Sequence, residues 1–215
     1  MGKVKIEWSP KFAYAIGLLV TDGCLVSDGR HISFTSKDLE LINNFQKGLS
    51  VHYYIGRKAS GSQEIKKYYT VQFSDVQFYN FLLTIGLTPR KTMTISNIKI
   101  PTQYFFDFLR GHFDGDGTFY SYWDLRWKSS FMFYTAFVSA SKTHIDWLRD
   151  MVLGTLGIRG HITKSINSSI YQLKYAKAES LKLFPKLYYD EGVVCLGRKR
   201  RKIEKAFRIN SKHIN

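Results

Sequence analysis

The sequence has few cysteines, few acidic residues and no long apolar segment. Its two cysteines, Cys24 and Cys195, stand far apart and lack the close spacing of zinc-binding pairs. We therefore expect both to be reduced, in an intracellular, reducing compartment. No apolar run approaches the roughly 18 residues that a transmembrane helix needs, and the first residues lack the apolar core of a signal peptide. These absences predict a protein that does not associate with membranes.

The scarcity of acidic residues leaves a large positive charge. The chain has 17 Asp and Glu against 32 Lys and Arg, which gives a formal net charge of +15. Such an excess predicts a polyanionic partner, most simply a nucleic acid, although a membrane surface or a ribosomal role is compatible with charge alone. Hydrophobic residues make up 44% of the chain and aromatic residues 16%. This is the composition of a folded globular protein.

Two segments, residues 15–23 (AIGLLVTDG) and 109–117 (LRGHFDGDG), match each other. Each reads as a mostly apolar helix that ends in Asp-Gly, and the glycine is predicted to close the helix in a left-handed conformation. Asp22 and Asp116 then lie in the last helical turn, where the helix dipole disfavours a carboxylate. Two carboxylates placed in this way predict a bound cation that neutralises them.

Small residues within these segments predict how the two helices meet. Ala13, Gly17 and Thr21 recur every four residues, and so do Gly111 and Gly115. Small residues at this spacing allow two helix backbones to approach closely. If the helices pack along these stripes, the two terminal carboxylates become neighbours, which requires a shared proton or a divalent metal ion. Paired carboxylates with Mg²⁺ are a common apparatus for phosphodiester cleavage.

Both segments resemble the motif that names the LAGLIDADG family of homing endonucleases. The second is a close match, whereas the first has Val20 where the motif often has its first acidic residue, so Asp114 lacks an acidic counterpart. The resemblance implies a site-specific double-strand DNA endonuclease with a long target. Without protein-splicing residues at its ends, the chain resembles an intron-encoded or free-standing form. The alternatives are an RNA-binding intron maturase and a DNA-binding regulator that does not cleave.

The predicted elements of the two halves follow the same order. Each half reads as αββαββα, which makes the chain an α+β protein with two pseudo-twofold repeats. We divide it into an N-terminal repeat (1–92), a linker (93–100) and a C-terminal repeat (101–215). Each repeat is expected to form an antiparallel, saddle-shaped sheet, with the two motif helices packed at the centre. The internal symmetry predicts a monomer.

Several boundaries within the repeats are predicted from local signals. Ser36 is expected to cap a helix over 37–49, matched by Ser141 at the start of a helix through residue 156. Residues 51–57 are predicted as a strand, and Pro101 is expected to open the second motif helix. The lone histidines His112 and His144 are interpreted as structural rather than catalytic.

The resemblance also assigns the metal site. It implies that Asp22 and Asp116 bind Mg²⁺ or Mn²⁺, each serving one DNA strand, with help from the backbone carbonyls of Thr21 and Gly115. Ca²⁺ is expected to support DNA binding without cleavage. Each repeat ends in an Arg-Lys pair, and the lysines of these pairs, Lys91 and Lys199, stand where related endonucleases often carry a catalytic lysine.

Polar side chains on the predicted strands and loops are candidates for contacts with double-stranded DNA. A β-ribbon can lie in the major groove, where donors and acceptors on one strand face read base edges. Together with the two matched helix starts and the basic residue before Lys199, the candidates are His31, Ser33, Thr35, Ser36, Lys37, Tyr54, Lys66, Tyr68, Thr70, Gln72, Arg126, Lys128, Ser141, Lys142, Arg159, His161, Thr163, Gln172, Lys174 and Arg198.

Overall fold

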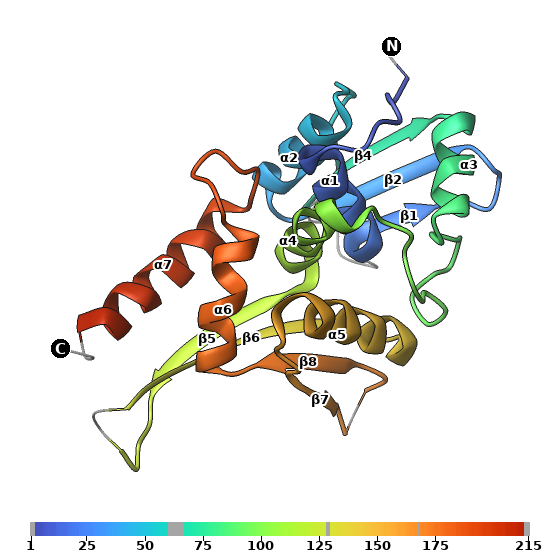
Figure 1. Ribbon diagram of the computed structural model, residues 1–215. Coiled ribbons are helices and arrows are strands. Elements are labelled where there is room, and N and C mark those ends of the chain that lie inside the picture. Colours follow the sequence, from blue (N-terminus) through green and yellow to red (C-terminus); the bar gives the residue numbers. More distant parts are fainter. Residues whose placement is uncertain (1–2, 60–66, 128–129, 167, 213–215) are drawn as a thin grey trace.

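Two four-stranded antiparallel sheets form the frame of the protein (Figure 1). The computed structural model describes residues 3–59, 67–127, 130–166 and 168–212. The first sheet has the order β1 (Gly23–Leu25), β2 (His31–Ser36), β4 (Tyr68–Ser74) and β3 (Gly56–Lys58). The second has the equivalent order β5 (Thr118–Trp123), β6 (Phe131–Ser139), β8 (Tyr171–Tyr175) and β7 (His161–Lys164). The repeated order confirms the predicted pseudo-twofold architecture.

The helices follow the same repeat, with one addition. Those of the N-terminal half are α1 (Pro10–Asp22), α2 (Leu39–Leu49) and α3 (Val76–Thr84), and those of the C-terminal half are α4 (Phe105–Asp116), α5 (Lys142–Leu156) and α6 (Lys177–Leu187). A further helix, α7 (Gly197–Lys212), follows α6 and has no counterpart in the N-terminal half among the described residues. No helix in the described ranges combines the length and the apolar character needed to cross a membrane.

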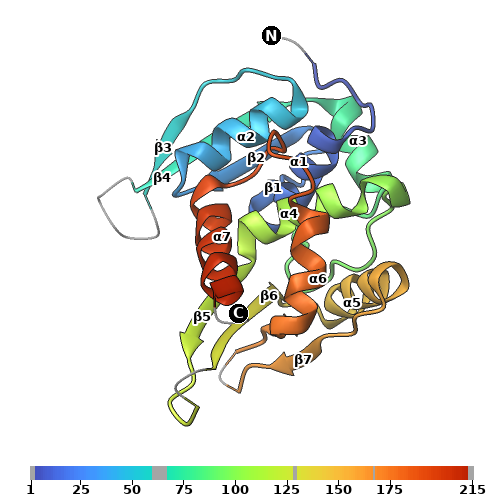
Figure 2. The same ribbon diagram turned by 60° about the vertical axis from the view of Figure 1, so that its left-hand side comes forward.

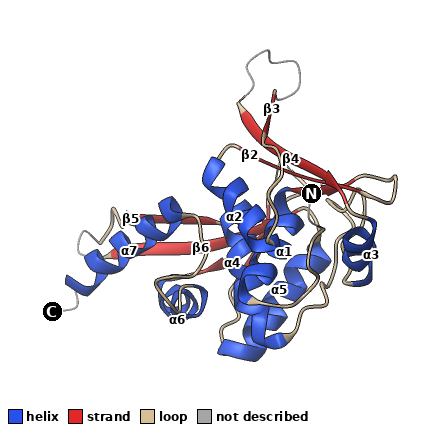
Figure 3. Ribbon diagram, turned by 90° about the horizontal axis from the view of Figure 1, so that it is seen from above, coloured by secondary structure: helices blue, strands red, loops and turns tan. Residues whose placement is uncertain are grey.

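The motif helices α1 and α4 lie side by side at the centre (Figures 1 and 2). Helix α1 begins where the sequence predicts, because the Ser9 side chain accepts a hydrogen bond from the Phe12 amide at 3.2 Å and Pro10 occupies the first turn. Residues 12–20 of this helix are all buried. Figure 3, with strands in red, shows the two sheets flanking these central helices.

Each sheet is covered by helices on one face, because apolar residues alternate along its strands. In β2, Ile32 and Phe34 are buried while their neighbours are half-buried, and Phe34 stacks on Phe45 of α2 at 4.5 Å between ring centroids. In β6, Phe133 and Phe137 face the core in the same way. The alternation leaves the other face of each sheet to polar side chains.

The prediction that glycines close the motif helices in a left-handed conformation is wrong. Gly23 has φ −85° and ψ 155°, and Gly117 has φ −70° and ψ 153°, so both backbones are extended. Glycine is needed at both positions because a side chain would not fit there. A Cβ added to Gly23 would lie 2.6 Å from the Leu19 carbonyl oxygen, and one added to Gly117 would lie 2.5 Å from that of Phe113.

Three local boundaries also differ from the predictions. Helix α2 starts at Leu39, and its flanking residue is Asp38, because Ser36 ends β2 and its hydroxyl accepts from the Asp38 amide at 3.1 Å. Ser139 accepts from the Ser141 amide in the same way at 3.1 Å, so Ser36 corresponds to Ser139 and not to Ser141.

The other two differences concern a strand and a helix start. Of the predicted strand 51–57, only Gly56 and Arg57 pair with β4, and the observed strand continues to Lys58. Pro101 precedes a short 3₁₀ turn, η1 (Thr102–Tyr104), and α4 begins after it at Phe105.

The two halves also differ in the hairpin after the motif helix. Strand β1 has 3 residues, whereas β5 has 6, so the β5–β6 hairpin extends well beyond the body of the protein (Figure 1). Its tip carries the exposed side chains of Leu125 and Trp127. The pseudo-twofold symmetry is therefore strong at the centre and weak at the edges.

Candidate nuclease centre and nucleic-acid interface

The close approach of α1 and α4 fixes the geometry of the centre. A Cβ added to Gly17 would lie 2.7 Å from the His112 amide nitrogen, and one added to Gly111 would lie 2.9 Å from the Tyr14 carbonyl carbon. Further along, a Cβ on Gly115 would lie 2.8 Å from an Asp22 carboxylate oxygen. The helices thus run in parallel with their backbones in contact, as the small-residue spacing predicts, and both C-terminal ends lie together.

The two motif aspartates meet at this shared end. Burial first, and then the negative charge of Asp116, raise the pKa of Asp22 to about 6 from an ordinary 3.8. Burial also raises the pKa of Asp116, and the charges of Lys199 and Lys91 counter that rise. Asp22 is half-buried and Asp116 is exposed, and their mutual repulsion favours a cation or a proton between them.

The backbone around the aspartates provides further oxygen atoms. The Thr21 hydroxyl oxygen lies 3.0 Å from the Leu18 carbonyl oxygen and 3.2 Å from an Asp22 carboxylate oxygen, so its single hydrogen is shared between these two acceptors. The Gly115 carbonyl accepts from Lys199 at 3.3 Å. A donor set of carboxylates and carbonyls suits a hard divalent cation such as Mg²⁺.

Lys91 and Lys199 flank the aspartates from equivalent directions. The Lys91 ammonium donates to the carbonyl of Gly23, and Lys199 donates to that of Gly117 at 2.6 Å. Lys199 also contacts three carbonyls of the last turn of α4, including that of Phe113 at 2.6 Å. Burial lowers the pKa of Lys91, and it lowers that of Lys199 to about 8. Each lysine therefore brings positive charge to the negative end of a motif helix.

The unmatched Asp114 has a structural place beside this centre. It is 1% exposed, and one carboxylate oxygen accepts from the Tyr14 hydroxyl at 2.8 Å and from the Leu196 amide at 2.6 Å. It thereby joins α4 to α1 and to the segment before α7. Burial raises its pKa to about 6.

Sequence reasoning missed a buried ion pair in α4. Arg110 is 1% exposed and donates to Asp107 at 2.7 Å, to the Leu187 carbonyl at 2.8 Å and to the Val194 carbonyl at 2.9 Å. The Tyr189 hydroxyl completes the pair by donating to Asp107 at 2.9 Å. A charged pair spaced i, i+3 inside an apolar motif helix was the available signal.

A small cavity of about 70 Å³ opens beside Asp116. Its walls include Thr21, Lys91, His112 and His144. The ranges that the structure describes contain no group of three or more His, Cys, Asp or Glu side chains arranged to hold a metal ion. A cation at the two aspartates would accordingly complete its shell with backbone carbonyls, water or substrate oxygens.

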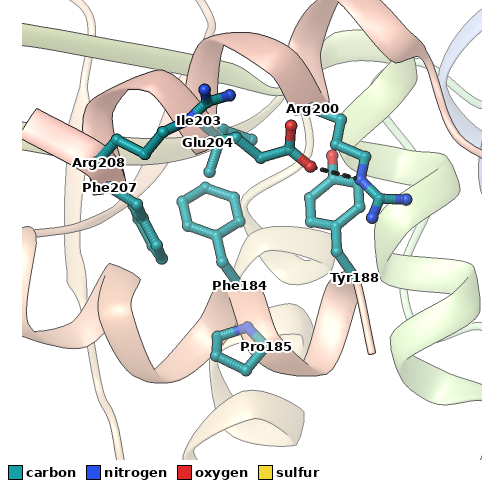
Figure 4. Close-up of a pocket in the computed structure, with 8 residues that line it drawn as sticks. All are labelled: Phe184, Pro185, Tyr188, Arg200, Ile203, Glu204, Phe207 and Arg208. Atoms are coloured by element: carbon teal, nitrogen blue, oxygen red, sulfur yellow. Dashed lines mark hydrogen bonds and ion pairs between the residues drawn. The ribbon is translucent and has the colours of Figure 1, made fainter. Parts of the chain in front are cut away.

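A larger hollow of about 510 Å³ lies elsewhere, between α6 and α7 (Figure 4). Phe184 stands between Tyr188 and Phe207 there, and Arg200 pairs with Glu204 at 2.8 Å. The hollow is lined by none of the predicted site residues.

The predicted polar face of the first sheet is present. His31, Ser33 and Thr35 alternate with buried residues along β2. Ser33 pairs with Gln72 of β4, and Thr35 pairs with Thr70, whose hydroxyl lies 2.9 Å from that of Thr35.

The remaining candidates of this half surround that face. Tyr68 pairs with Lys58 of β3, and the Lys37 ammonium lies over its ring at 5.3 Å from the centroid. Ser36 ends β2. Tyr54 is 83% exposed but precedes β3 rather than lying in a strand. Lys66 lies outside the described residues.

The second sheet has a comparable face. His161 of β7 pairs with Lys174 of β8, and Thr163 pairs with Gln172. Arg159 is exposed just before β7. The sequence analysis missed the aromatic part of this face, where Tyr120 and Tyr134 pair across β5 and β6 and their rings stack at 5.3 Å. Tyrosines at alternate positions of β5 were the signal for it.

Four other candidates have roles within the protein. Ser141 is 3% exposed and caps α5, so its side chain is not available to DNA. Lys142 pairs with Asp146 at 2.6 Å, and Arg198 pairs with Asp38 at 2.6 Å across the two halves. Arg126, at the tip of the β5–β6 hairpin, is exposed beside Asp124. Lys128 lies outside the described residues.

Comparisons with solved structures identify the fold. The chain resembles full-length DUF199/WhiA from Thermatoga maritima with a TM-score of 0.58 and 16% identity, over 97% of this chain and 63% of that one. It resembles the I-LtrWI LAGLIDADG homing endonuclease bound to target DNA with a TM-score of 0.62 and 10% identity, over 94% and 91% of the two chains. It resembles the I-SmaMI LAGLIDADG homing endonuclease bound to cleaved DNA with a TM-score of 0.59 and 13% identity, over 98% and 92%.

The protein therefore has the LAGLIDADG fold. Both motif helices lie in one chain, as α1 and α4. The chain spans about two thirds of the length of full-length WhiA. No family model and no curated protein matches the sequence.

Proposed function

We propose that the protein is a divalent-metal-dependent DNA endonuclease of the homing type, which cuts both strands of a long target. The observation that carries the proposal is the meeting of Asp22 and Asp116 at the joined ends of α1 and α4, where burial and mutual repulsion raise the pKa of Asp22 to about 6. A chain that needed only to bind DNA would gain stability by replacing these carboxylates with neutral groups. Their presence supports a catalytic use.

In this proposal each residue of the centre has a chemical task. Asp22 and Asp116, with the carbonyls of Thr21 and Gly115, would hold Mg²⁺ or Mn²⁺. When bound, such a cation activates water and neutralises charge on the scissile phosphate. Lys91 and Lys199 add positive charge beside the aspartates, which favours the negative charge that builds up during phosphodiester hydrolysis.

The proposed substrate is double-stranded DNA, bound across the polar faces of both sheets. Support comes from the net charge of +15 and from the donors and acceptors on those faces. Support also comes from I-LtrWI and I-SmaMI, which share the fold and are bound to DNA in their structures. The aromatic face around Tyr120 and Tyr134 makes one half of the interface different from the other.

A DNA-binding protein without cleavage is the second candidate. The specific observation in its favour is the similarity to WhiA. Two of the solved structures that share this fold are of WhiA, which has a LAGLIDADG domain, and neither is of a homing endonuclease. An RNA-binding maturase on the same fold is a further alternative, and it would bind structured RNA without needing the aspartates.

The experiment first finds the target and then tests cleavage. The protein, with Ca²⁺ present, selects bound duplexes from a randomised DNA library, and the recovered sequences define the site. Mg²⁺ or EDTA is then added to the purified complex. Cleavage of both strands with Mg²⁺ and none with EDTA is the expected result. Selective binding with no cleavage in Mg²⁺ or Mn²⁺ would favour the non-cleaving regulator.

A further inference from the structure

Two buried histidines break the symmetry of the centre. His112 follows Gly111 in α4, and the equivalent residue after Gly17 in α1 is Leu18. His144 lies three residues after the N-cap of α5, where α2 has Leu41 three residues after Asp38. All four side chains are at most 2% exposed. The C-terminal half therefore has two imidazoles where the N-terminal half has two leucines.

The histidine pair leaves two ring nitrogens without protein partners. Within the described residues, His112 Nδ1 and His144 Nε2 are buried and make no hydrogen bond to the protein. An unpaired buried polar atom is destabilising, and leucines at these positions would avoid that cost. The fold of the N-terminal half shows that leucine is compatible with both positions. His112 Nδ1 and His144 Nε2 therefore need a hydrogen-bonding partner that the protein itself does not provide.

The hydrogen bonding of His144 shows that its partner must be a hydrogen-bond donor. Its Nδ1 lies 2.7 Å from the Ser96 carbonyl oxygen, which can only accept, so Nδ1 carries the proton. Burial lowers the pKa of His144 to about 4, so the ring is neutral near pH 7. Nε2 then presents a lone pair, which accepts a hydrogen bond from a small donor. The rings of His112 and His144 stack at 5.3 Å between centroids, with 22° between their planes.

The cavity beside Asp116 provides the space for such a donor. Both imidazoles line it, together with Asp116, Lys91 and Thr21. Its volume of about 70 Å³ has room for at least one water molecule. Water is small enough for this space, and it can donate to one ring nitrogen and accept from another.

We propose that His112 and His144 form a water-binding site that opens onto Asp116, and that it positions water for only one half of the candidate centre. His144 is a positioning residue here, because it acts on the reaction through water. The water site stands on its own, whereas its role in cutting rests on the proposed nuclease function. The consequence is that the two DNA strands are cut with unequal dependence on these histidines.

The first test does not need nuclease activity. A crystal structure of the protein, at a resolution that shows ordered water, is expected to contain water within about 3.2 Å of His144 Nε2 and of His112 Nδ1. Ring nitrogens that bond instead to protein atoms, or a cavity closed by side chains, would overturn the proposal.

The second test measures the rate of cutting of each strand on the selected target, with the two strands separately labelled. His144→Leu gives the C-terminal half the residue of the N-terminal half, so it is expected to fold. We expect the ratio of the two strand rates to change by about 10-fold to 100-fold, the usual effect of losing a positioning partner. His144→Gln keeps an acceptor oxygen and should restore the ratio in part. The matched control is Leu41→Met, which should leave the ratio unchanged.

The outcomes separate the two hypotheses. If wild type cuts neither strand, the proposed function fails, and the crystallographic test still decides the water site. If wild type cuts both strands and His144→Leu slows them equally or not at all, the positioning role fails. Equal rates for His144→Gln and His144→Leu would likewise assign the histidine a packing role only.

Discussion

At the scale of single residues, the fold places charged side chains of the centre where their charged forms are destabilised. Asp22 ends a helix whose dipole opposes a carboxylate, is half-buried, and faces the charge of Asp116. Lys91 and Lys199 offset part of this disadvantage by donating to the carbonyls at the same helix ends. The arrangement favours a bound cation, because a cation relieves all three unfavourable terms together.

Replacing either motif aspartate with asparagine tests this balance. Asp22→Asn and Asp116→Asn should each abolish double-strand cleavage and leave DNA binding largely intact, since the carboxylates lie at the ends of α1 and α4 rather than on the outer sheet faces. Cleavage of the selected target and binding in Ca²⁺ are the measurements. The control is Asp150→Asn on the exposed side of α5, which should change neither. Retained double-strand cleavage in both motif variants would refute the site.

The same substitution should stabilise the metal-free protein at neutral pH. The pKa of Asp22 is about 6 in the folded state against an ordinary 3.8, so the folded state loses stability as pH rises from about 4 through 6. At pH 7 the loss is about 3 kcal/mol, at 1.36 kcal/mol for each pKa unit. Asp22→Asn removes this loss, and we expect a Tm higher by several degrees in EDTA. A Tm gain as large at pH 4 as at pH 7 would contradict this cause.

Metal affinity should follow the ionisation of the same carboxylates. Because the raised pKa of Asp22 lies near 6, protons compete with a divalent cation below that pH. Isothermal titration with Mn²⁺ between pH 5 and 8 is expected to show affinity that falls as pH drops through about 6. An affinity that is constant down to pH 5 would place the cation elsewhere.

At the scale of elements, the crossing of α1 and α4 holds the centre together. The two backbones touch at Gly17 and Gly111, and the glycines leave no room there for a side chain. The joined helix ends are what bring Asp22 and Asp116 together. A disturbance at the crossing therefore reaches both the stability of the fold and the geometry of the aspartates.

Adding one methyl group at the crossing tests the packing. Gly17→Ala would place its Cβ 2.7 Å from the His112 amide nitrogen, against backbone that cannot move alone. We expect a loss of about 1–3 kcal/mol or more in the free energy of unfolding, measured by urea denaturation. Gly154→Ala on α5 is the matched control, because its Cβ would meet nothing within 4 Å. There, the higher helix propensity of alanine should stabilise by up to about 1 kcal/mol. Equal effects at both glycines would contradict close packing at the crossing.

How much of these elements could be predicted depends on the range of the forces involved. The spacing of small residues predicted the helix crossing, and the repeat predicted the order of elements. Both signals are patterns among residues that are near one another in the sequence. The extended conformation of Gly23 could not be predicted in this way, since Gly23 is the first residue of β1 and pairs with Phe34 of β2. The predicted start of α2 was wrong because Ser36 and Asp38 are both good capping residues. Ser36 is the last residue of β2, so the helix begins after Asp38.

The centre itself was predictable in part for the same reason. The motif identified Asp22 and Asp116, and the repeated Arg-Lys pairs identified Lys91 and Lys199. His112 and His144 were interpreted from the sequence as lone histidines with a structural role, and their proximity to each other was not predicted. Their pairing joins α4 to α5, and sequence spacing gives no access to such a contact.

At the scale of the whole molecule, the two sheets offer related but unequal surfaces to a duplex. The first presents hydroxyl and amide groups around Ser33, Thr70 and Gln72, whereas the second adds stacked tyrosines and the long β5–β6 hairpin. A pseudo-twofold frame with unequal faces suits a target whose two half-sites differ in sequence. The excess of positive charge then sets how strongly any duplex is held.

Salt dependence measures that charge contribution and locates it. If the sheet faces contact about 6–10 phosphates, affinity for the selected duplex should fall by about 10³ to 10⁵ between 50 and 200 mM salt. Lys174→Gln, on the outer face of the second sheet beside His161, should reduce the slope of log affinity against log salt by about 0.9 if Lys174 contacts a phosphate. The matched control is Lys186→Gln, an exposed lysine on α6, a helix that packs on the core side of the same sheet. A slope that changes equally in both variants would mean that the charge acts as a diffuse field over the whole surface, and the duplex would then have no preferred face.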